Sequence, residues 1–327
     1  MKPQDYILSK LKELSNPIGL DKPSDEAQLI EEITRLVLSK KFRKYSVGPD
    51  PLNHIKVSIE ASVQDNEPIK FTLPFGAYKL WRLEETPEAD WAELFAMMYF
   101  TKWLKPICEI YEPGVWFDFY SDDVIIPRMN NIPLEDMVAY RASFEAVLGF
   151  IKSYQPENMS MTLSRVIDQY ASQEDFEKDY EEQTTKLKAS LEGGLPILDD
   201  AEKAMIELNV KAEPEQLKDP KWREKVKLIH DSYASVSGRR PYYRPLEMHK
   251  IMVVTTPLWG MLTVGSTKDS TMKFWVGAGL LRPREASFRQ IILSPSQLEK
   301  TILHTEPVDI ENLTGKNFSR ICITEDE

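Results

Sequence analysis

The sequence predicts an α/β protein in which a layered, Rossmann-like core is followed by a charged helical insertion and a strand-rich antiparallel C-terminal part. Three observations predict this class. Helical and strand-like segments alternate over residues 1–170, charged helical segments fill residues 171–237, and short strand-like runs succeed one another over residues 238–327. We interpret these ranges as the core, a cap or insertion, and a C-terminal part that packs on the core.

The first 45 residues predict two helices that cover one face of a larger layer. Apolar residues recur at helical spacing over residues 7–14 and 29–37, and Ser24 is the expected N-cap of the second helix. Residues 54–74 alternate polar and β-branched side chains on both sides of the turn-like sequence DNEP. This pattern predicts a pair of strands.

The middle of the core is predicted to alternate between helix and strand. Residues 87–105 have the wide apolar face of a buried helix, which Pro106 interrupts or kinks. The next segment predicts a strand that breaks at residues 121–123, and extended structure is expected to resume over residues 124–126. A strong helix is predicted over residues 134–153.

The remaining chain changes in character. Charged helices are predicted between residues 174 and 235, and their narrow apolar stripes favour a cap over a separate core. From Lys250 onward, β-branched and aromatic runs joined by short turns predict an antiparallel meander.

Composition argues against several classes of protein. A formal charge of −11 and a pI near 5.1 argue against a nucleic-acid-binding face, which needs clustered Lys and Arg. The two cysteines, Cys108 and Cys322, cannot form a disulfide framework and are expected to be buried thiols. We expect a cytoplasmic protein without membrane contact, because the N-terminal region lacks a signal-peptide pattern and no apolar run reaches membrane-spanning length.

Two cations follow the second strand of the predicted pair. In the sequence LPFGAYKLWR, Gly76 loosens the backbone and presents Lys79 and Arg82, which suit a phosphate or a carboxylate. The alternative is that both are solvated charges beside Tyr78 and Trp81.

A hydroxyl and two carboxylates stand at the predicted strand break. Ser121, Asp122 and Asp123 could take a divalent metal, hold a substrate ammonium group, or supply a general base if one pKa is raised. Loops at strand ends are the usual place for the chemistry of α/β proteins. A turn in which the Ser and Asp side chains bond the backbone is the alternative.

The densest cationic stretch covers residues 238–250. It contains Arg239, Arg240, Arg244, Glu247, His249 and Lys250. Arginines in such a group could bind a phosphate and a carboxylate through bidentate hydrogen bonds, and His249 could transfer a proton near neutral pH. The alternative is a surface loop that pairs with the acidic helices of residues 174–202.

Several well-known motifs are missing from the sequence. It contains no Gly-x-Gly-x-x-Gly after a strand, no Walker loop, no Gly-x-Ser-x-Gly elbow and no His-Glu-x-x-His. The sequence therefore lacks the motifs that would best support a dinucleotide-binding protein, an NTPase, an α/β-hydrolase or a zincin. His54, His230 and His304 lack a partner at metal-ligand spacing, so structural roles are expected for them.

The order of several motifs resembles the isonitrile synthases of the pyoverdine and dityrosine biosynthesis family. EPIKFTLPFGAYK, IYEPGVWFDFYSDDVI and a helix containing VAYRASF occur in the family order, with its Tyr-x-Pro-Gly and Ser-Asp elements at residues 111–114 and 121–122. Residues 244–249 and the sequence TTPLWG at residues 255–260 look like later family segments. Asp123 departs from the family pattern, which has glycine there, and the tryptophan of TTPLWG is spaced differently.

The resemblance implies that the amine of an amino acid, commonly tyrosine or tryptophan, condenses with the ketone of ribulose 5-phosphate and ends as an isonitrile. No cofactor or metal is implied, and the partners are these small molecules. Phosphate and carboxylate groups need cations, and imine formation and carbon deprotonation need acid–base groups. The implied catalytic residues are Lys79, Ser121, Asp122 and His249, and the implied substrate-binding residues are Arg82, Arg239, Arg240 and Arg244.

Two other functions stay open. A metal-dependent transferase would use Asp118, Asp122 and Asp123 as magnesium or manganese ligands on a nucleotide-linked substrate, and activity that vanishes with a chelator would favour it. A non-enzymatic binding module would carry a partner on the acidic helices of residues 174–235, and function that survives changes throughout the predicted site would favour that.

Overall fold

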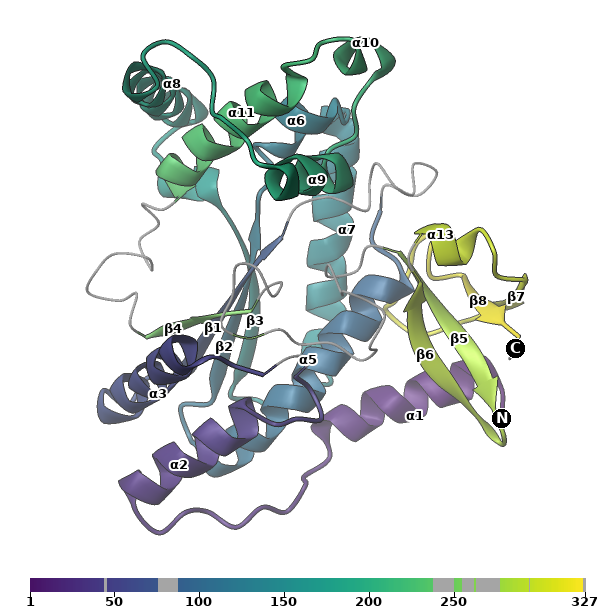
Figure 1. Ribbon diagram of the computed structural model, residues 1–327. Coiled ribbons are helices and arrows are strands. Elements are labelled where there is room, and N and C mark those ends of the chain that lie inside the picture. Colours follow the sequence, from purple (N-terminus) through teal and green to yellow (C-terminus); the bar gives the residue numbers. More distant parts are fainter. Residues whose placement is uncertain are drawn as a thin grey trace.

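The computed structural model describes residues 1–43, 46–75, 88–237, 250–254, 262, 277–293 and 295–325. The chain forms two sheets with helices around them, which confirms the predicted α/β class (Figure 1). Within the described ranges, no helix is both long enough and apolar enough to cross a bilayer.

The first sheet is parallel and has the strand order β3-β2-β1-β4. Its strands are β1 (Ile69–Phe75), β2 (Val115–Ser121), β3 (Met159–Arg165) and β4 (Ile251–Val253). The register pairs Ser121 with Phe75 on one side and with Arg165 on the other. Three strands therefore end in one row, at the edge where open α/β sheets bind their ligands.

Helices pack around this sheet and on one another, and most of them follow the predicted pattern. They are α1 (Pro3–Ser15), α2 (Glu26–Val37), α3 (Pro49–Gln64), α5 (Trp91–Ile110), α6 (Ile126–Asn130) and α7 (Leu134–Lys152). The capping box of Asp90 and Glu93 starts α5, which continues through Pro106. The expected interruption at Pro106 is therefore wrong. Asp25 caps α2 in place of the expected Ser24, because its side chain accepts from Gln28 N.

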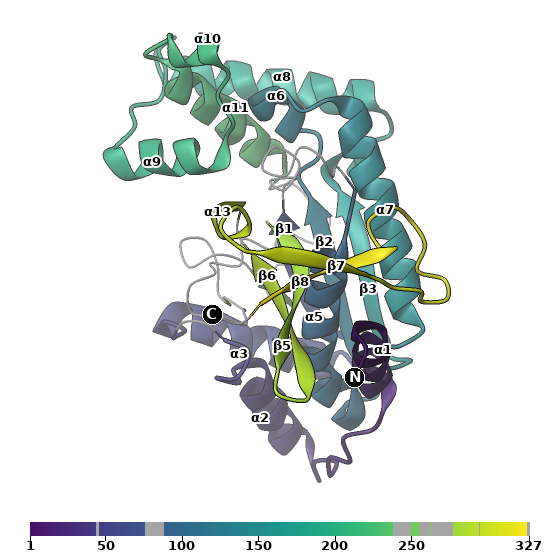
Figure 2. The same cartoon turned by 90° about the vertical axis from the view of Figure 1, so that its right-hand side faces the viewer.

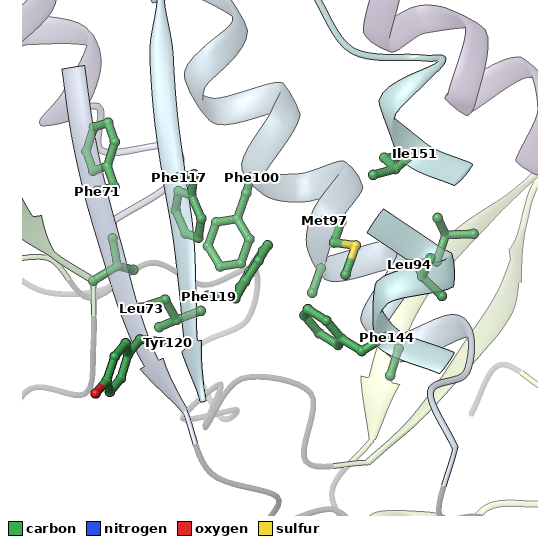
Figure 3. Close-up of a cluster of buried hydrophobic side chains, with 14 of the residues drawn as sticks. Phe71, Leu73, Leu94, Met97, Phe100, Phe117, Phe119, Tyr120, Phe144 and Ile151 are labelled. Carbon is green, nitrogen blue, oxygen red and sulfur yellow. The ribbon is translucent and has the colours of Figure 1, made fainter. Parts of the chain in front are cut away.

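Aromatic side chains join α5 to the sheet (Figure 3). The ring of Phe100 on α5 lies 4.7 Å from that of Phe117 on β2, and Phe119 meets Phe144 of α7 edge to face at 5.2 Å. All four rings are fully buried. The centre of the core thus lies directly behind the central strand, and it holds the end of β2 in position.

Two predicted strands are helices instead. Residues 54–64 belong to α3, because their buried residues recur with a helical period and not in alternation: Ile55, Ser58, Ile59, Ser62 and Val63. The expected extended segment over residues 124–126 is a turn into α6, with Pro127 at the helix start, where proline is favoured. Strand β3 was not predicted at all, since it lies at the sheet edge and is mostly half-buried.

The charged segment forms the predicted helical layer over the carboxyl ends of the strands (Figure 2). Its helices are α8 (Gln173–Ser190), α9 (Asp200–Asn209), α10 (Pro214–Leu217) and α11 (Trp222–Ser237). Arg128 of α6 stacks on Tyr180 of α8, 4.4 Å from the ring centroid, and its guanidinium pairs with Glu177 at 2.5 Å. These contacts attach the layer to the segment that leaves β2.

The second sheet is mixed, so the predicted antiparallel meander is wrong in its topology. Its strands are β5 (Ala278–Arg284), β6 (Ser287–Leu293), β7 (Leu303–Pro307) and β8 (Arg320–Thr324), with α13 (Pro295–Leu298) between β6 and β7. The pairs β5–β6 and β7–β8 are antiparallel, but β5 and β8 are parallel. The first strand after Lys250, β4, joins the first sheet because it finds a parallel partner in β1.

The second sheet packs on α5. A Cβ at Gly279 of β5 would lie 2.2 Å from Ala92 N, so only glycine permits this approach. Trp91 Nε1 donates to Arg320 O at 2.7 Å. Of the two cysteines, Cys108 is buried as predicted and Cys322 is half-buried. Burial raises the pKa of Cys108 to about 12, which leaves its thiol unreactive.

Candidate functional site

Ser121 and Asp122 lie at the carboxyl end of the central strand β2, as the sequence predicts. The backbone turns directly after them, since Ile125 N donates to Asp122 O at 3.1 Å at the start of α6. Tyr233 of α11 donates its hydroxyl to Asp122 Oδ1 at 2.7 Å. Tyr233 lies 111 residues after Asp122 in the chain, so the helical layer orients this carboxylate through a long-range contact.

Asp123 is buried, with only 7% of its side chain exposed, and it pairs with arginines from two other elements. Arg165 Nε at the end of β3 donates to Asp123 Oδ2 at 2.6 Å, and Arg141 Nη1 of α7 lies 3.7 Å away. Burial raises the pKa of Asp123 even though both arginines lower it. Where the isonitrile synthase pattern has glycine, this chain thus has a carboxylate that ties β2 to β3 and α7.

The second oxygen of Asp123 is unpaired. Asp123 Oδ1 has no hydrogen-bond partner within the described part of the chain. A cavity of about 10 Å³ lies beside it, lined in part by Ser121, Tyr140 and Arg141. That volume is near the minimum for one water molecule, so it has no room for a substrate.

Asp118 points to β3 from the middle of β2 and is fully buried. Its Oδ1 accepts hydrogen bonds from Thr162 Oγ1 at 2.8 Å and from Ser164 Oγ at 2.6 Å. Among the described residues, Asp118, Asp122 and Asp123 thus bond to three different sets of partners. Across the described ranges, no three His, Cys, Asp or Glu side chains group closely enough to hold a metal ion.

The other predicted site residues lie outside the described residues: Lys79, Arg82, Arg239, Arg240, Arg244 and His249. The segment with Lys79 and Arg82 follows Phe75, whose partner in the sheet is Ser121. Lys250, which follows His249 in the chain, lies at the opposite, amino end of β1, where its Nζ pairs with Asp65 at 2.5 Å and with Glu67 at 3.2 Å. Lys250 therefore does not lie at the carboxyl edge of the sheet, where Ser121 lies.

Sequence reasoning missed Tyr233 and Arg165, the two residues that hold Asp122 and Asp123. Arg165 would have been found if β3 had been recognised, because it ends that strand beside Ser121. Tyr233 carries no local signal, since an aromatic residue on an amphipathic helix usually packs in a core.

Comparison with known proteins finds a solved structure with a similar fold. No family model matches the chain, and no curated protein matches it. Among solved structures, the chain is similar to the crystal structure of the PvcA protein from Pseudomonas aeruginosa, with a TM-score of 0.58 and 14% sequence identity. The likeness covers 91% of this chain and 100% of that chain. At this identity the comparison shows that the two proteins share their overall fold.

Proposed function

We propose that this protein is an isonitrile synthase-like enzyme that joins the amine of an amino acid to the ketone of ribulose 5-phosphate. The ketone carbon would become the isonitrile carbon, so its bonds to both neighbouring carbons would break, and formaldehyde, hydroxyacetone, inorganic phosphate and water would leave. The observation that carries the proposal is the position of Ser121 and Asp122. They are the Ser-Asp element of the motif order that resembles this family, and they end the central strand of a fold similar to PvcA.

We assign proton transfer to Asp122, with the Tyr233 hydroxyl as the positioning group. The 2.7 Å bond from Tyr233 fixes one carboxylate oxygen, so the orientation of Asp122 is set before a substrate arrives. A carboxylate held in this way can remove a proton from the substrate amine or from its carbon. Ser121 would orient a substrate group by hydrogen bonding. A proton-transfer role for His249 rests on the sequence resemblance alone, because the next residue, Lys250, lies at the opposite, amino end of β1.

The anionic groups of both substrates require cations that are not already paired. The arginines at this edge, Arg165 and Arg141, both face Asp123. We therefore assign phosphate and carboxylate binding to the cations that the sequence analysis singled out, which lie outside the described residues. The proposed groups are Lys79, Arg82, Arg239, Arg240 and Arg244.

The separate partners of Asp118, Asp122 and Asp123 favour this proposal over the metal-dependent transferase. A metal site of that kind needs its carboxylate oxygens to converge on one point. In this arrangement, Asp118 Oδ1 accepts from two hydroxyl groups, and Asp123 Oδ2 pairs with a guanidinium group.

The first test is a screen of the purified protein with ribulose 5-phosphate and each aromatic amino acid, with and without EDTA, read by thermal shift and mass spectrometry. Stabilisation by the phosphosugar together with a new isonitrile mass is the expected result. If the phosphosugar has no effect and a divalent ion with a nucleotide stabilises the protein, the proposal fails and the transferase is favoured.

The second test is Asp122→Asn. The rate of isonitrile formation should fall by about 100-fold or more, because the amide cannot act as a base, while the melting temperature changes little. Asp200→Asn is the matched control, since the Asp200 side chain on α9 is fully exposed. An unchanged rate in Asp122→Asn would remove Asp122 from the chemistry.

A further inference from the structure

A cavity lies on the far side of α5 from the candidate site. It has a volume of about 540 Å³, and it is lined by α1, α5, β6 and the segment around Phe42. These elements pack side by side (Figure 1). Phe100 of α5 contacts Phe117 of β2, so the helix itself separates the cavity from the end of the parallel sheet. The volume is in the range that small-molecule sites occupy.

The wall of the cavity is strongly cationic in a protein whose formal charge is −11. Among the described residues, it contains Lys10, Lys41, Lys102, Lys105 and Arg289 but only one acidic residue, Glu13. Glu13 already pairs with Lys10 at 2.6 Å. Lys105 is buried and donates to the backbone carbonyl groups of Glu13 and Asn16, so it closes the C-terminal end of α1.

Three of these cations have no acidic partner among the residues that the structure describes. Lys41, Lys102 and Arg289 form no ion pair with any carboxylate of the described chain, and they come from three different elements. Desolvation, followed by repulsion from Lys41 and Lys10, lowers the pKa of Lys102. The charges therefore repel one another in the absence of a ligand, and an anion between them would relieve that repulsion.

The rest of the wall is apolar and partly aromatic. Phe42 and Tyr99 meet edge to face at 5.3 Å, and the Tyr99 hydroxyl donates to Phe42 O at 3.3 Å, which fixes the two rings. Leu14, Phe95 and Ile291 extend this apolar surface. A ligand that fits both parts of the wall has an acidic head group and an apolar body.

We propose that this cavity binds a small amphipathic anion, with its acidic head between Lys41 and Lys102 and its apolar body against Phe42 and Tyr99. The proposal does not depend on the reaction proposed above, because the cavity lies on the opposite side of α5. It describes a second ligand site, separate from that of the substrates.

The test uses the full-length protein and the fluorescent anion 8-anilinonaphthalene-1-sulfonate. The wild-type protein should bind it saturably and bind its uncharged analogue N-phenyl-1-naphthylamine more weakly. Lys102→Glu should weaken binding of the anion by about tenfold or more, because an attraction becomes a repulsion. Lys300→Glu changes an exposed lysine outside the cavity, and it should alter binding by about twofold or less owing to screening.

Competition experiments test where the dye binds and which class of ligand the cavity prefers. Dodecanoate or 1-naphthoate should displace the dye, and the better competitor distinguishes an aliphatic from an aromatic body. Ribulose 5-phosphate should not displace it. Equal binding of charged and uncharged dye, equal effects of the two lysine variants, or displacement by ribulose 5-phosphate would each overturn the proposal. If Lys102→Glu lowers the melting temperature, Lys102→Gln provides the same comparison with a smaller change.

Discussion

Replacing Arg165 with methionine should strongly destabilise the protein at neutral pH, because it leaves the carboxylate of Asp123 buried without its closest cation. A hydrogen bond to a charged group contributes about 1.5–3 kcal/mol, and removing one partner of a fully buried ion pair costs about 3–5 kcal/mol. Arg165 is 24% exposed, and Arg141 remains 3.7 Å from Asp123. We therefore expect the free energy of unfolding to fall by about 2–3 kcal/mol.

The pH dependence of this loss follows from the raised pKa of Asp123. For an acid whose pKa is higher in the folded state, the stabilising contribution is present below the unfolded pKa and is lost as the pH rises through the folded pKa. Arg165 lowers the pKa of Asp123, so its removal raises that pKa further. The pH range between the unfolded and the folded pKa, over which stability is lost, therefore becomes wider. The difference between Arg165→Met and wild type should therefore grow as the pH rises and shrink in acid, where Asp123 is protonated.

Urea unfolding followed by circular dichroism, at neutral pH and near pH 5, measures both effects. Arg35→Met is the matched control, because Arg35 forms an exposed pair with Glu32 and should cost about 0.5 kcal/mol or less. The double variant with Asp123→Asn should remove most of the pH dependence that Arg165→Met introduces. A loss of the same size at both pH values, or no difference between the double and single variants, would refute the role of the buried carboxylate.

Two further predictions concern the site and the fold. Tyr233→Phe should lower the rate of isonitrile formation by about tenfold while the melting temperature stays near that of wild type, and an unchanged rate would contradict the positioning role of Tyr233 on Asp122. Gly114→Ala should lower the free energy of unfolding by about 3 kcal/mol or more, because φ is +71° and the new Cβ would lie 1.8 Å from Asn158 O. Gly149→Ala, in an open helical position of α7, should raise it by about 0.5–1 kcal/mol in the same urea assay, and equal effects at both glycines would contradict this reasoning.

Local periodicity was enough to predict the long elements. Helices α1, α2, α5 and α7 each carry an apolar stripe that is visible within 12–20 residues, strand β1 alternates apolar residues with other residues, and strand β2 is largely apolar. The charged helices of the cap were also predicted. Because the sequence places Ser121 and Asp122 at the end of a strand, the candidate site could be located without coordinates.

Short or half-buried elements could not be assigned in this way. The segment of α3 before Gln64 shows a brief alternation that also fits a helix, and the choice depends on the layer against which it packs. β3 is short, and its buried face carries only Met159, Met161 and Leu163, while β4 joins β1 from more than 170 residues away in the chain. Strand order depends on contacts between segments that are far apart in the chain, so it cannot be predicted from a short stretch of sequence.

The sequence alone therefore determined the class of fold, the position of strand β2 and the acidic residues at its end. Only the tertiary structure decided which groups those acids contact. It pairs Asp123 with Arg165, bonds Asp122 to Tyr233 and buries Asp118 under hydroxyl groups of β3. The physical reason is that secondary structure follows from side chains a few residues apart, whereas the protonation and orientation of a carboxylate depend on groups brought to it from 42, 44 or 111 residues away.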